Sequence, residues 1–319
     1  TELLKEEILF WKFCQYKFYE QWKFLKQYAN TRGIQIIGDI PLYMAMDSAD
    51  VWADRKLFLL EEDGSQQHVA GSPPDNFSEE GQKWGNPVYD YSYMEEHQFD
   101  WWRHRIEKNA ALYDVIRIDH FLGVVRYYTI PFQEKDCCNG KWNKGPGKKL
   151  TDVMEESAGD CRIIADNAGS AIAGSRKLLA RIGWPGSKIL MFAFDGNTGN
   201  ENLPHNFEEN NIVVYTGTHD NDTVVGYFRD KTEYELAYLY EYLNIGSKEE
   251  IPDALIRLAY SSIADVVIIP MQDILQLGNE ARMNQPSTVG QNWKWRVGKD
   301  TLSEERRAWI RTIAAVYRR

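Results

Sequence analysis

Residues 113–123 read YDVIRIDHFLG and combine an apolar run with a group of charged residues. It opens with an apolar, β-branched run typical of a buried strand and then places Arg117, Asp119 and His120 close together. Helical patterns separate several further apolar runs, which lie at residues 34–43, 161–166, 188–195, 211–220 and 265–270. Continuous apolar strands that alternate with helices indicate a parallel sheet covered on both faces. We therefore predict an α/β fold with six such strands.

Charged residues follow these strands at their carboxyl ends. Asp39, Asp119 and Asp166 each lie at or just beyond an apolar run, and the pair His219 and Asp220 follows another. A single aspartate of this kind is better explained as a cap for the next helix. Four strand ends with acidic residues instead favour a common site, because the carboxyl ends of the strands in a (β/α)8 barrel open onto one face, where catalytic groups collect.

The segment FWKFCQYKFYEQWKFLKQY, residues 10–28, carries aromatic residues at a spacing of three to four. This spacing predicts a helix that ends near Gly33. We expect its aromatic face to pack in the core rather than to contact a ligand.

The composition narrows the class of partner. A net charge of −10 disfavours nucleic acid and anionic lipid, which both need clustered Lys and Arg, so a neutral ligand is expected. The absence of any apolar run of about 18 residues and of a signal-peptide pattern predicts neither a membrane span nor secretion. The four cysteines form neither a disulfide framework nor a CxxC metal pattern, so we expect reduced thiols and a cytoplasmic location.

Two long segments, 44–100 and 124–158, interrupt the alternation of strands and helices and are rich in Gly, Pro, Asn and Trp. Loops of this length are usually functional or disordered, and the density of aromatic residues argues against disorder. We expect a single catalytic domain over residues 1–319, with these two segments as inserted substrate-loop subdomains at the carboxyl ends of the strands.

The carboxylates could cleave a glycosidic bond, with one attacking the sugar carbon while the other protonates the departing oxygen. Arg117 and Asp119 are two residues apart on one strand and share a face, so the cation would hold Asp119 ionised as a nucleophile. Asp166 would be the acid. His219 and Asp220 would bind sugar hydroxyls and strengthen those contacts as the ring flattens.

A metal site is the rival interpretation of the same residues. Three aspartates on successive strand ends can also chelate Mg²⁺ in a barrel enzyme that enolises its substrate. Arg117 weakens this alternative, because its guanidinium already supplies the compensating charge and would repel a divalent ion.

Five blocks of sequence, in order along the chain, resemble the 4-α-glucanotransferases called amylomaltases or disproportionating enzymes, glycoside hydrolase family 77. They read GDIPLYMAMDSADVW (38–52), GSPPDNFSEEGQKWGNPVYDY (71–91), VIRIDHF (115–121), YTGTHDNDT (215–223) and ARMNQPST (281–288). The resemblance implies a (β/α)8 TIM barrel of the α-amylase clan, with long inserted loops at its carboxyl-terminal face.

The resemblance also implies a role for each matching position. Asp119 corresponds to the nucleophile, Asp166 stands at the acid/base position, and Asp220 corresponds to the third carboxylate, which stabilises the distorted sugar. The implied substrate-binding residues are Asp39, Tyr43, Asp75, Phe77, Gln82, Trp84, Asn86, Arg117, His120, Phe192, His219 and Asn284. In this family the substrates are α-1,4-glucans and maltooligosaccharides, the 4-hydroxyl of a second sugar resolves the glycosyl-enzyme, and no metal or organic cofactor takes part.

Three departures from the family pattern qualify this expectation. The strand that carries Asp39 resembles the third of the barrel, so we expect the first two strands to be missing and a missing N-terminal segment of the same protein to be a partner. The family usually has Glu where this chain has Asp166, and commonly Arg where it has Leu122. An impaired remnant that binds glucan without cleaving it is therefore the alternative to a glucan-transferring enzyme.

Overall fold

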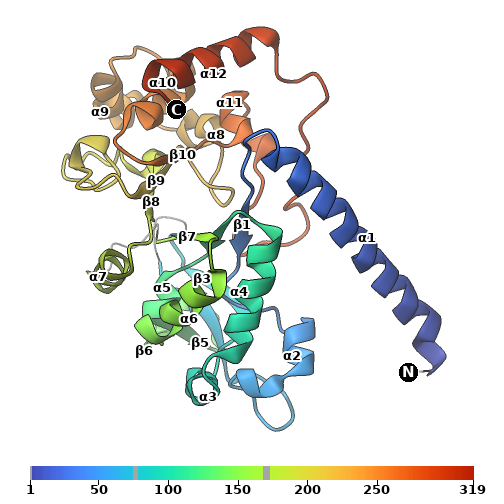
Figure 1. The fold of residues 1–319 in the computed structure, drawn as a ribbon. Coiled ribbons are helices and arrows are strands. Elements are labelled where there is room, and N and C mark those ends of the chain that lie inside the picture. The colour runs from blue at the N-terminus through green and yellow to red at the C-terminus, as the bar shows by residue number, and fades with distance from the viewer. Residues whose placement is uncertain (1, 75–77, 168–172) are drawn as a thin grey trace.

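The computed structural model describes residues 2–74, 78–167 and 173–319. All six expected parallel strands are present, as β1 (Ile37–Ile40), β4 (Val115–Ile118), β7 (Arg162–Ala165), β8 (Gly186–Ile189), β9 (Ile212–Tyr215) and β10 (Val266–Ile268). They form two three-stranded parallel sheets, ordered β1-β4-β7 and β10-β9-β8 (Figure 1). Within the described residues, the strands thus make part of a barrel and do not close it, as expected.

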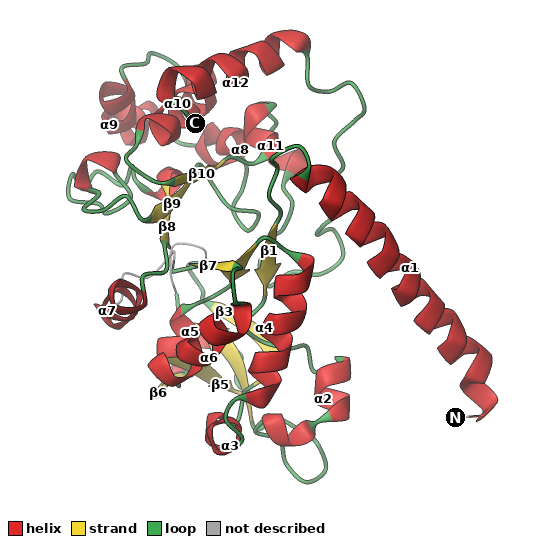
Figure 2. Ribbon diagram, in the orientation of Figure 1, coloured by secondary structure: helices red, strands yellow, loops and turns green. Residues whose placement is uncertain are grey.

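Helices follow and cover the strands (Figure 2). The longer ones after the first strand are α4 (Asp100–Leu112), α6 (Lys148–Ala158), α7 (Ala173–Ile182), α9 (Glu233–Leu243), α10 (Ile251–Ser261) and α12 (Glu304–Tyr317). The shorter ones are α2 (Ala49–Ala53), α3 (Tyr91–Glu96), α5 (Leu122–Val125), α8 (Val224–Arg229) and α11 (Met271–Ile274). Each sheet has its own hydrophobic core, with Ile116 and Trp102 in the first and Val214 and Leu255 in the second, all fully buried.

A four-stranded antiparallel sheet was not expected from the sequence. It consists of β2 (His68–Ser72), β3 (Gln82–Pro87), β5 (Arg126–Pro131) and β6 (Lys141–Lys144), in the order β3-β2-β5-β6. The pairing of β2 with β5 joins residues 44–100 to residues 124–158 in one sheet. Side chains of this sheet line one pocket together with residues that follow β1 and β4.

The first helix, α1 (Lys5–Asn30), corrects one expectation. It forms where predicted and Gly33 follows it with a φ of +74°, but its aromatic residues do not pack in the core. Of its residues only Ala29 is buried, whereas Phe10 is 57% exposed and Phe24 is 66% exposed. The helix projects away from the other elements, and Trp22 connects it to them by donating a hydrogen bond to the Leu112 carbonyl (Figure 1). The spacing of the aromatic residues predicts an apolar face but does not show what covers it.

The fourth apolar run also differs from its prediction. The run 188–195 was expected to be a strand, but β8 spans Gly186–Ile189 and residues Leu190–Phe192 form a 3-10 turn. These residues are buried, so their apolar character reflects burial rather than extended backbone.

Candidate active site

The register of β1, β4 and β7 brings the first carboxylates together. Asp39 pairs with Arg117 across the two strands. The pairing continues one residue beyond each strand, since the Asp119 amide donates to the Ile40 carbonyl at 3.0 Å and the Asp166 amide donates to the Ile118 carbonyl at 2.9 Å. Asp119 and Asp166 therefore leave neighbouring strand ends side by side.

The Arg117 side chain is the centre of this group and is almost fully buried, at 7% exposure. Its Nη1 lies 2.6 Å from Oδ2 of Asp39 and 3.2 Å from Oδ1 of Asp119. Its Nη2 lies 2.9 Å from Oδ2 of Asp166. Burial disfavours the charged guanidinium, but the three carboxylates outweigh it and hold the pKa of Arg117 well above its ordinary value.

The protonation of Asp119 differs from the sequence prediction. Arg117 was expected to hold this carboxyl ionised, and it does lower the pKa. Desolvation acts more strongly in the opposite direction, and together with the neighbouring Asp166 carboxylate it raises the pKa of Asp119 to about 8. One guanidinium shared among three carboxylates therefore does not keep all of them ionised at neutral pH.

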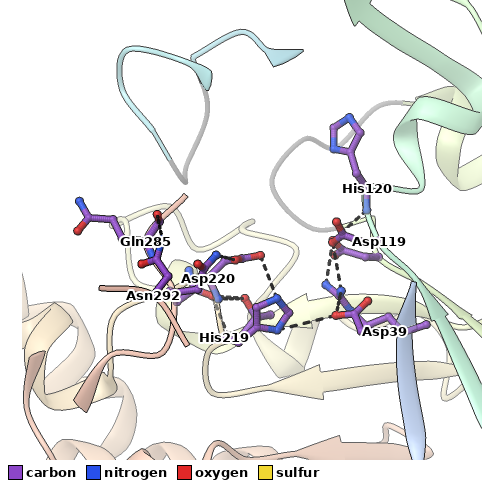
Figure 3. Close-up of polar contacts among 12 residues, drawn as sticks. Asp39, Asp119, His120, His219, Asp220, Gln285 and Asn292 are labelled. Atoms are coloured by element: carbon purple, nitrogen blue, oxygen red, sulfur yellow. Dashed lines mark hydrogen bonds and ion pairs between the residues drawn. The ribbon is translucent and has the colours of Figure 1, made fainter. Parts of the chain in front are cut away.

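The second sheet supplies the third carboxylate. His219 and Asp220 lie in the loop after β9, and His219 sits between Asp39 and Asp220, at 3.8 Å and 3.4 Å from their carboxylates (Figure 3). Asn284 holds Asp220 in place, because its side-chain amide donates a 2.6 Å hydrogen bond to Oδ1 of Asp220. The backbone amide of Asn284 also donates to the His219 carbonyl. The late block of the sequence thus positions the loop after β9.

His120 lies in the turn that follows β4. Its backbone is left-handed, with a φ of +48°, which is strained for a residue with a side chain. In this conformation its amide lies 3.4 Å from Oδ2 of Asp166, and its ring contacts Trp84 edge-on at 4.7 Å. The backbone strain therefore coincides with the group of carboxylates.

Most of the predicted site residues meet at one groove of about 710 Å³. Those lining it are Tyr43, Gln82, Trp84, Asn86, Asp119, His120, Asp166, Asp220 and Asn284. A smaller cavity of about 370 Å³ is lined by Asp39, Arg117 and His219. The ion pairs of Arg117 and His219 connect the two spaces. Trp84 is oriented by a hydrogen bond to the Gln82 side chain at 2.8 Å.

Three further predicted residues are placed at neither the groove nor the smaller cavity. Phe192 lies in the hydrophobic core of the second sheet, 9% exposed, and lines neither the groove nor the cavity. Asp75 and Phe77 fall outside the described residues.

The groove also contains residues that sequence reasoning missed. Arg126 and Trp142, from residues 124–158, line it, and neither belongs to a recognisable sequence motif. The only signal for them was the aromatic content of that segment. Asp273 lines the smaller cavity instead and was also missed. It is 1% exposed and accepts hydrogen bonds from the Thr216 hydroxyl at 2.5 Å and the Val224 amide at 2.8 Å. These two residues flank the loop that carries His219 and Asp220, so Asp273 clamps both ends of that loop.

The described residues form neither a metal-binding cluster nor a membrane-spanning helix. Across residues 2–74, 78–167 and 173–319, no group of three or more His, Cys, Asp or Glu side chains is arranged to hold a metal ion. Within the same residues, every helix is too short or too polar to cross a membrane.

Known proteins resemble this chain along nearly its whole length. The model of the family Glyco_hydro_77, described as 4-alpha-glucanotransferase, matches residues 1–301. A 4-alpha-glucanotransferase of Clostridium butyricum is 47% identical over 99% of this chain, and one of Thermus thermophilus is 43% identical over 98%. The solved amylomaltase of Streptococcus agalactiae in complex with acarbose superimposes with a TM-score of 0.90 and 42% identity over 96% of this chain.

The matches cover a smaller share of each relative's length than of this chain's length. The chain spans 65% of the Clostridium protein, 63% of the Thermus protein and 62% of the Streptococcus chain. The described strands are those of a partial barrel of the α-amylase clan. A family model that matches most of the sequence, together with relatives above 40% identity, shows that the chain belongs to the 4-alpha-glucanotransferases of glycoside hydrolase family 77.

Proposed function

We propose that this protein transfers segments of α-1,4-glucan between maltooligosaccharides by a retaining double displacement. The observation that carries the proposal is the guanidinium of Arg117, which contacts the carboxylates of both Asp119 and Asp166 at the groove. A retaining reaction needs a closely spaced pair of carboxyl groups, one as nucleophile and one as acid. Membership of the family supports the same reaction.

In the first step, a carboxylate oxygen of Asp119 attacks C1 of the glucose unit at the cleavage point. The bond from C1 to the glycosidic oxygen breaks, and its electron pair takes the proton of Asp166, so the shortened glucan leaves with a new 4-hydroxyl. The donor segment remains as an ester on Asp119.

In the second step, Asp166 is ionised and acts as the base. It takes the proton from the 4-hydroxyl of an acceptor glucan, whose oxygen attacks C1 and displaces the Asp119 carboxylate. Two inversions restore the α configuration, and the number of glycosidic bonds is unchanged. The first step needs one proton on the pair, on Asp166 rather than on Asp119, and the second step returns that proton to Asp166.

Asp220 and His219 are proposed to bind hydroxyls of the same glucose unit. Their contact with each other, and the bond from Asn284 to Asp220, hold them in place before the substrate arrives. Donors and acceptors that are already positioned stabilise the flattened ring of the transition state without further reorganisation. We also propose Tyr43, Trp84 and Asn86 as part of the groove wall that contacts the glucan.

The proposal extends to partners and location. The net charge of −10 supports a neutral glucan rather than nucleic acid or an anionic membrane as the partner. The free state of Cys14, Cys137, Cys138 and Cys161 supports a cytoplasmic location.

Incubation with maltotriose tests the activity. A transferase produces glucose together with longer oligomers, which chromatography separates. Glucose without longer oligomers would indicate a hydrolase. Maltotriose that is bound but left unchanged would favour the glucan-binding remnant.

A further inference from the structure

Arg126, at the start of β5, stacks on Trp142 of β6. The carbon at the centre of its guanidinium lies 4.2 Å from the centre of the Trp142 ring. The sheet holds this arrangement. Trp142 is the cross-strand partner of Tyr128, which lies two residues after Arg126. The rings of Tyr128 and Trp142 meet edge-on at 5.1 Å. Tyr128 is itself anchored, because its hydroxyl donates to the Cys137 carbonyl at 2.9 Å. The indole therefore fixes the plane of the guanidinium.

The Arg126 guanidinium is an unsatisfied group. Its Nε is buried and has no hydrogen-bond partner among the described residues, and those residues also offer its terminal nitrogens no hydrogen bond or ion pair. Arg105 is the informative contrast, since it also stacks on a tryptophan, Trp102, yet donates a hydrogen bond to the Pro41 carbonyl at 2.5 Å. Stacking on indole therefore does not by itself leave an arginine without acceptors. A buried donor without an acceptor costs about 1–3 kcal/mol, which a ligand with acceptor oxygens would offset.

The location of Arg126 indicates which ligand supplies those oxygens. Arg126 and Trp142 line the same groove of about 710 Å³ as Asp119 and Asp166. A molecule that fills the groove from the carboxylates outward therefore meets this guanidinium. Leu122, which lines the same groove, offers no donor of its own.

We propose that Arg126, held by Trp142, binds the hydroxyl oxygens of a further glucose unit of the glucan, beyond the unit at which the bond is cleaved. This inference rests on the proposed function. The flat fork of N–H donors on arginine suits the neighbouring hydroxyls of a sugar ring.

An anionic ligand at this position is less favourable. Asp119, Asp166 and Asp220 line the same groove, and the chain carries a net charge of −10, so an anion would be repelled on entering. A neutral sugar avoids this repulsion and still supplies acceptors to Arg126.

Binding of maltooligosaccharides of increasing length tests the inference. Calorimetry is done on the Asp119→Asn protein, so that no bond is cleaved during the measurement. Adding Arg126→Leu should weaken maltoheptaose binding by about tenfold. This corresponds to about 1.4 kcal/mol, the effect of losing hydrogen bonds to a charged group. Maltose binding should stay within about twofold.

Lys144→Leu is the matched control. Lys144 is the direct cross-strand partner of Arg126, is exposed and does not line the groove. The substitution therefore removes the same charge from the same sheet. It should leave the affinity for every length unchanged. Arg126→Lys keeps the charge but loses the fork, and should weaken maltoheptaose binding by about threefold or more. This variant carries the test if Arg126→Leu does not fold.

The outcomes separate the two proposals. Unchanged maltoheptaose binding in both Arg126 variants would overturn the subsite, as would an equal loss for maltose and maltoheptaose. Inorganic phosphate that binds through Arg126, with no effect of the substitutions on maltoheptaose, would assign the guanidinium to an anion instead. Failure of the Asp119→Asn protein to bind any maltooligosaccharide would contradict the proposed function itself.

Discussion

Nη2 of Arg117 lies 2.9 Å from Oδ2 of Asp166, so the guanidinium that contacts the proposed nucleophile also holds the proposed acid. The sequence resemblance implies Glu at this position, and the Asp166 side chain is one methylene shorter. The ion pair ties this shorter side chain to Arg117 at the strand ends.

Asp166→Glu should raise turnover on maltotriose by about tenfold to a hundredfold, because the longer side chain restores the reach of the acid. The measurement is best made in a protein that also carries the two further strands expected from the sequence. An α-glucosyl fluoride is the control substrate. Its leaving group needs almost no protonation, so the Asp and Glu forms should use it nearly equally. Equal differences on both substrates would mean that the defect lies in binding or folding rather than in reach.

Asp119→Asn should abolish turnover and leave the affinity for maltooligosaccharides within a few-fold. The nucleophile contributes mainly in the transition state, whereas the walls of the groove bind the ground state. Rates by chromatography and affinities by calorimetry measure the two effects separately. A variant with normal turnover would remove Asp119 from its proposed role.

The value of kcat/KM should fall as the pH rises above about 8. The pKa of Asp119 is raised to about 8 by burial and by the Asp166 carboxylate, and in an interacting pair this value describes the last proton that the pair retains. The reaction needs that proton, so the rate should drop about tenfold for each pH unit above this value. A profile that stays flat to pH 10 would contradict the proposed use of the proton.

Asp273→Asn tests the buried clamp on the loop after β9. Burial raises the pKa of Asp273 to about 6, above the value of about 3.9 for an unfolded chain. The native state therefore binds the proton more tightly, and its stability falls as the pH rises from about 4 to 6. The free energy of unfolding of Asp273→Asn minus that of the unsubstituted protein should be about 2 kcal/mol larger at pH 8 than at pH 4, because only the unsubstituted protein loses stability over this range. Urea unfolding at both pH values measures this difference, and a difference independent of pH would show that the carboxyl is not titrating.

EDTA should leave the activity unchanged, because Arg117 supplies the positive charge that balances the carboxylates. Maltotriose conversion with and without the chelator measures this. Loss of activity that Mg²⁺ restores would favour the metal-dependent interpretation.

The strands and their charged ends could be predicted because the relevant signals are local. The apolar run before Asp119 and that before Asp166 each define a strand, and parallel order places their ends together. The antiparallel sheet could not be predicted in the same way, since β2 and β5 pair between segments far apart in the sequence. The helix α1 shows another limit, because the spacing of its aromatic residues predicts an apolar face that the described residues leave largely exposed.

The electrostatics of the site also needed the structure. The sequence shows that Arg117 and Asp119 share a face, but not that Asp39 and Asp166 compete for the same guanidinium. The pKa of Asp119 is raised because of burial and of that competition. Arg126 could not be singled out from sequence, because a single arginine forms no pattern. Its unsatisfied Nε becomes evident only once its neighbours are placed.

The most direct test of the account is a count of reducing ends during incubation with maltoheptaose. Transfer exchanges one glycosidic bond for another, so oligomers both shorter and longer than maltoheptaose should form while the total number of reducing ends stays constant. A rise in reducing ends that matches the loss of maltoheptaose would show that water, rather than a sugar 4-hydroxyl, resolves the intermediate on Asp119, and would contradict the proposed transfer.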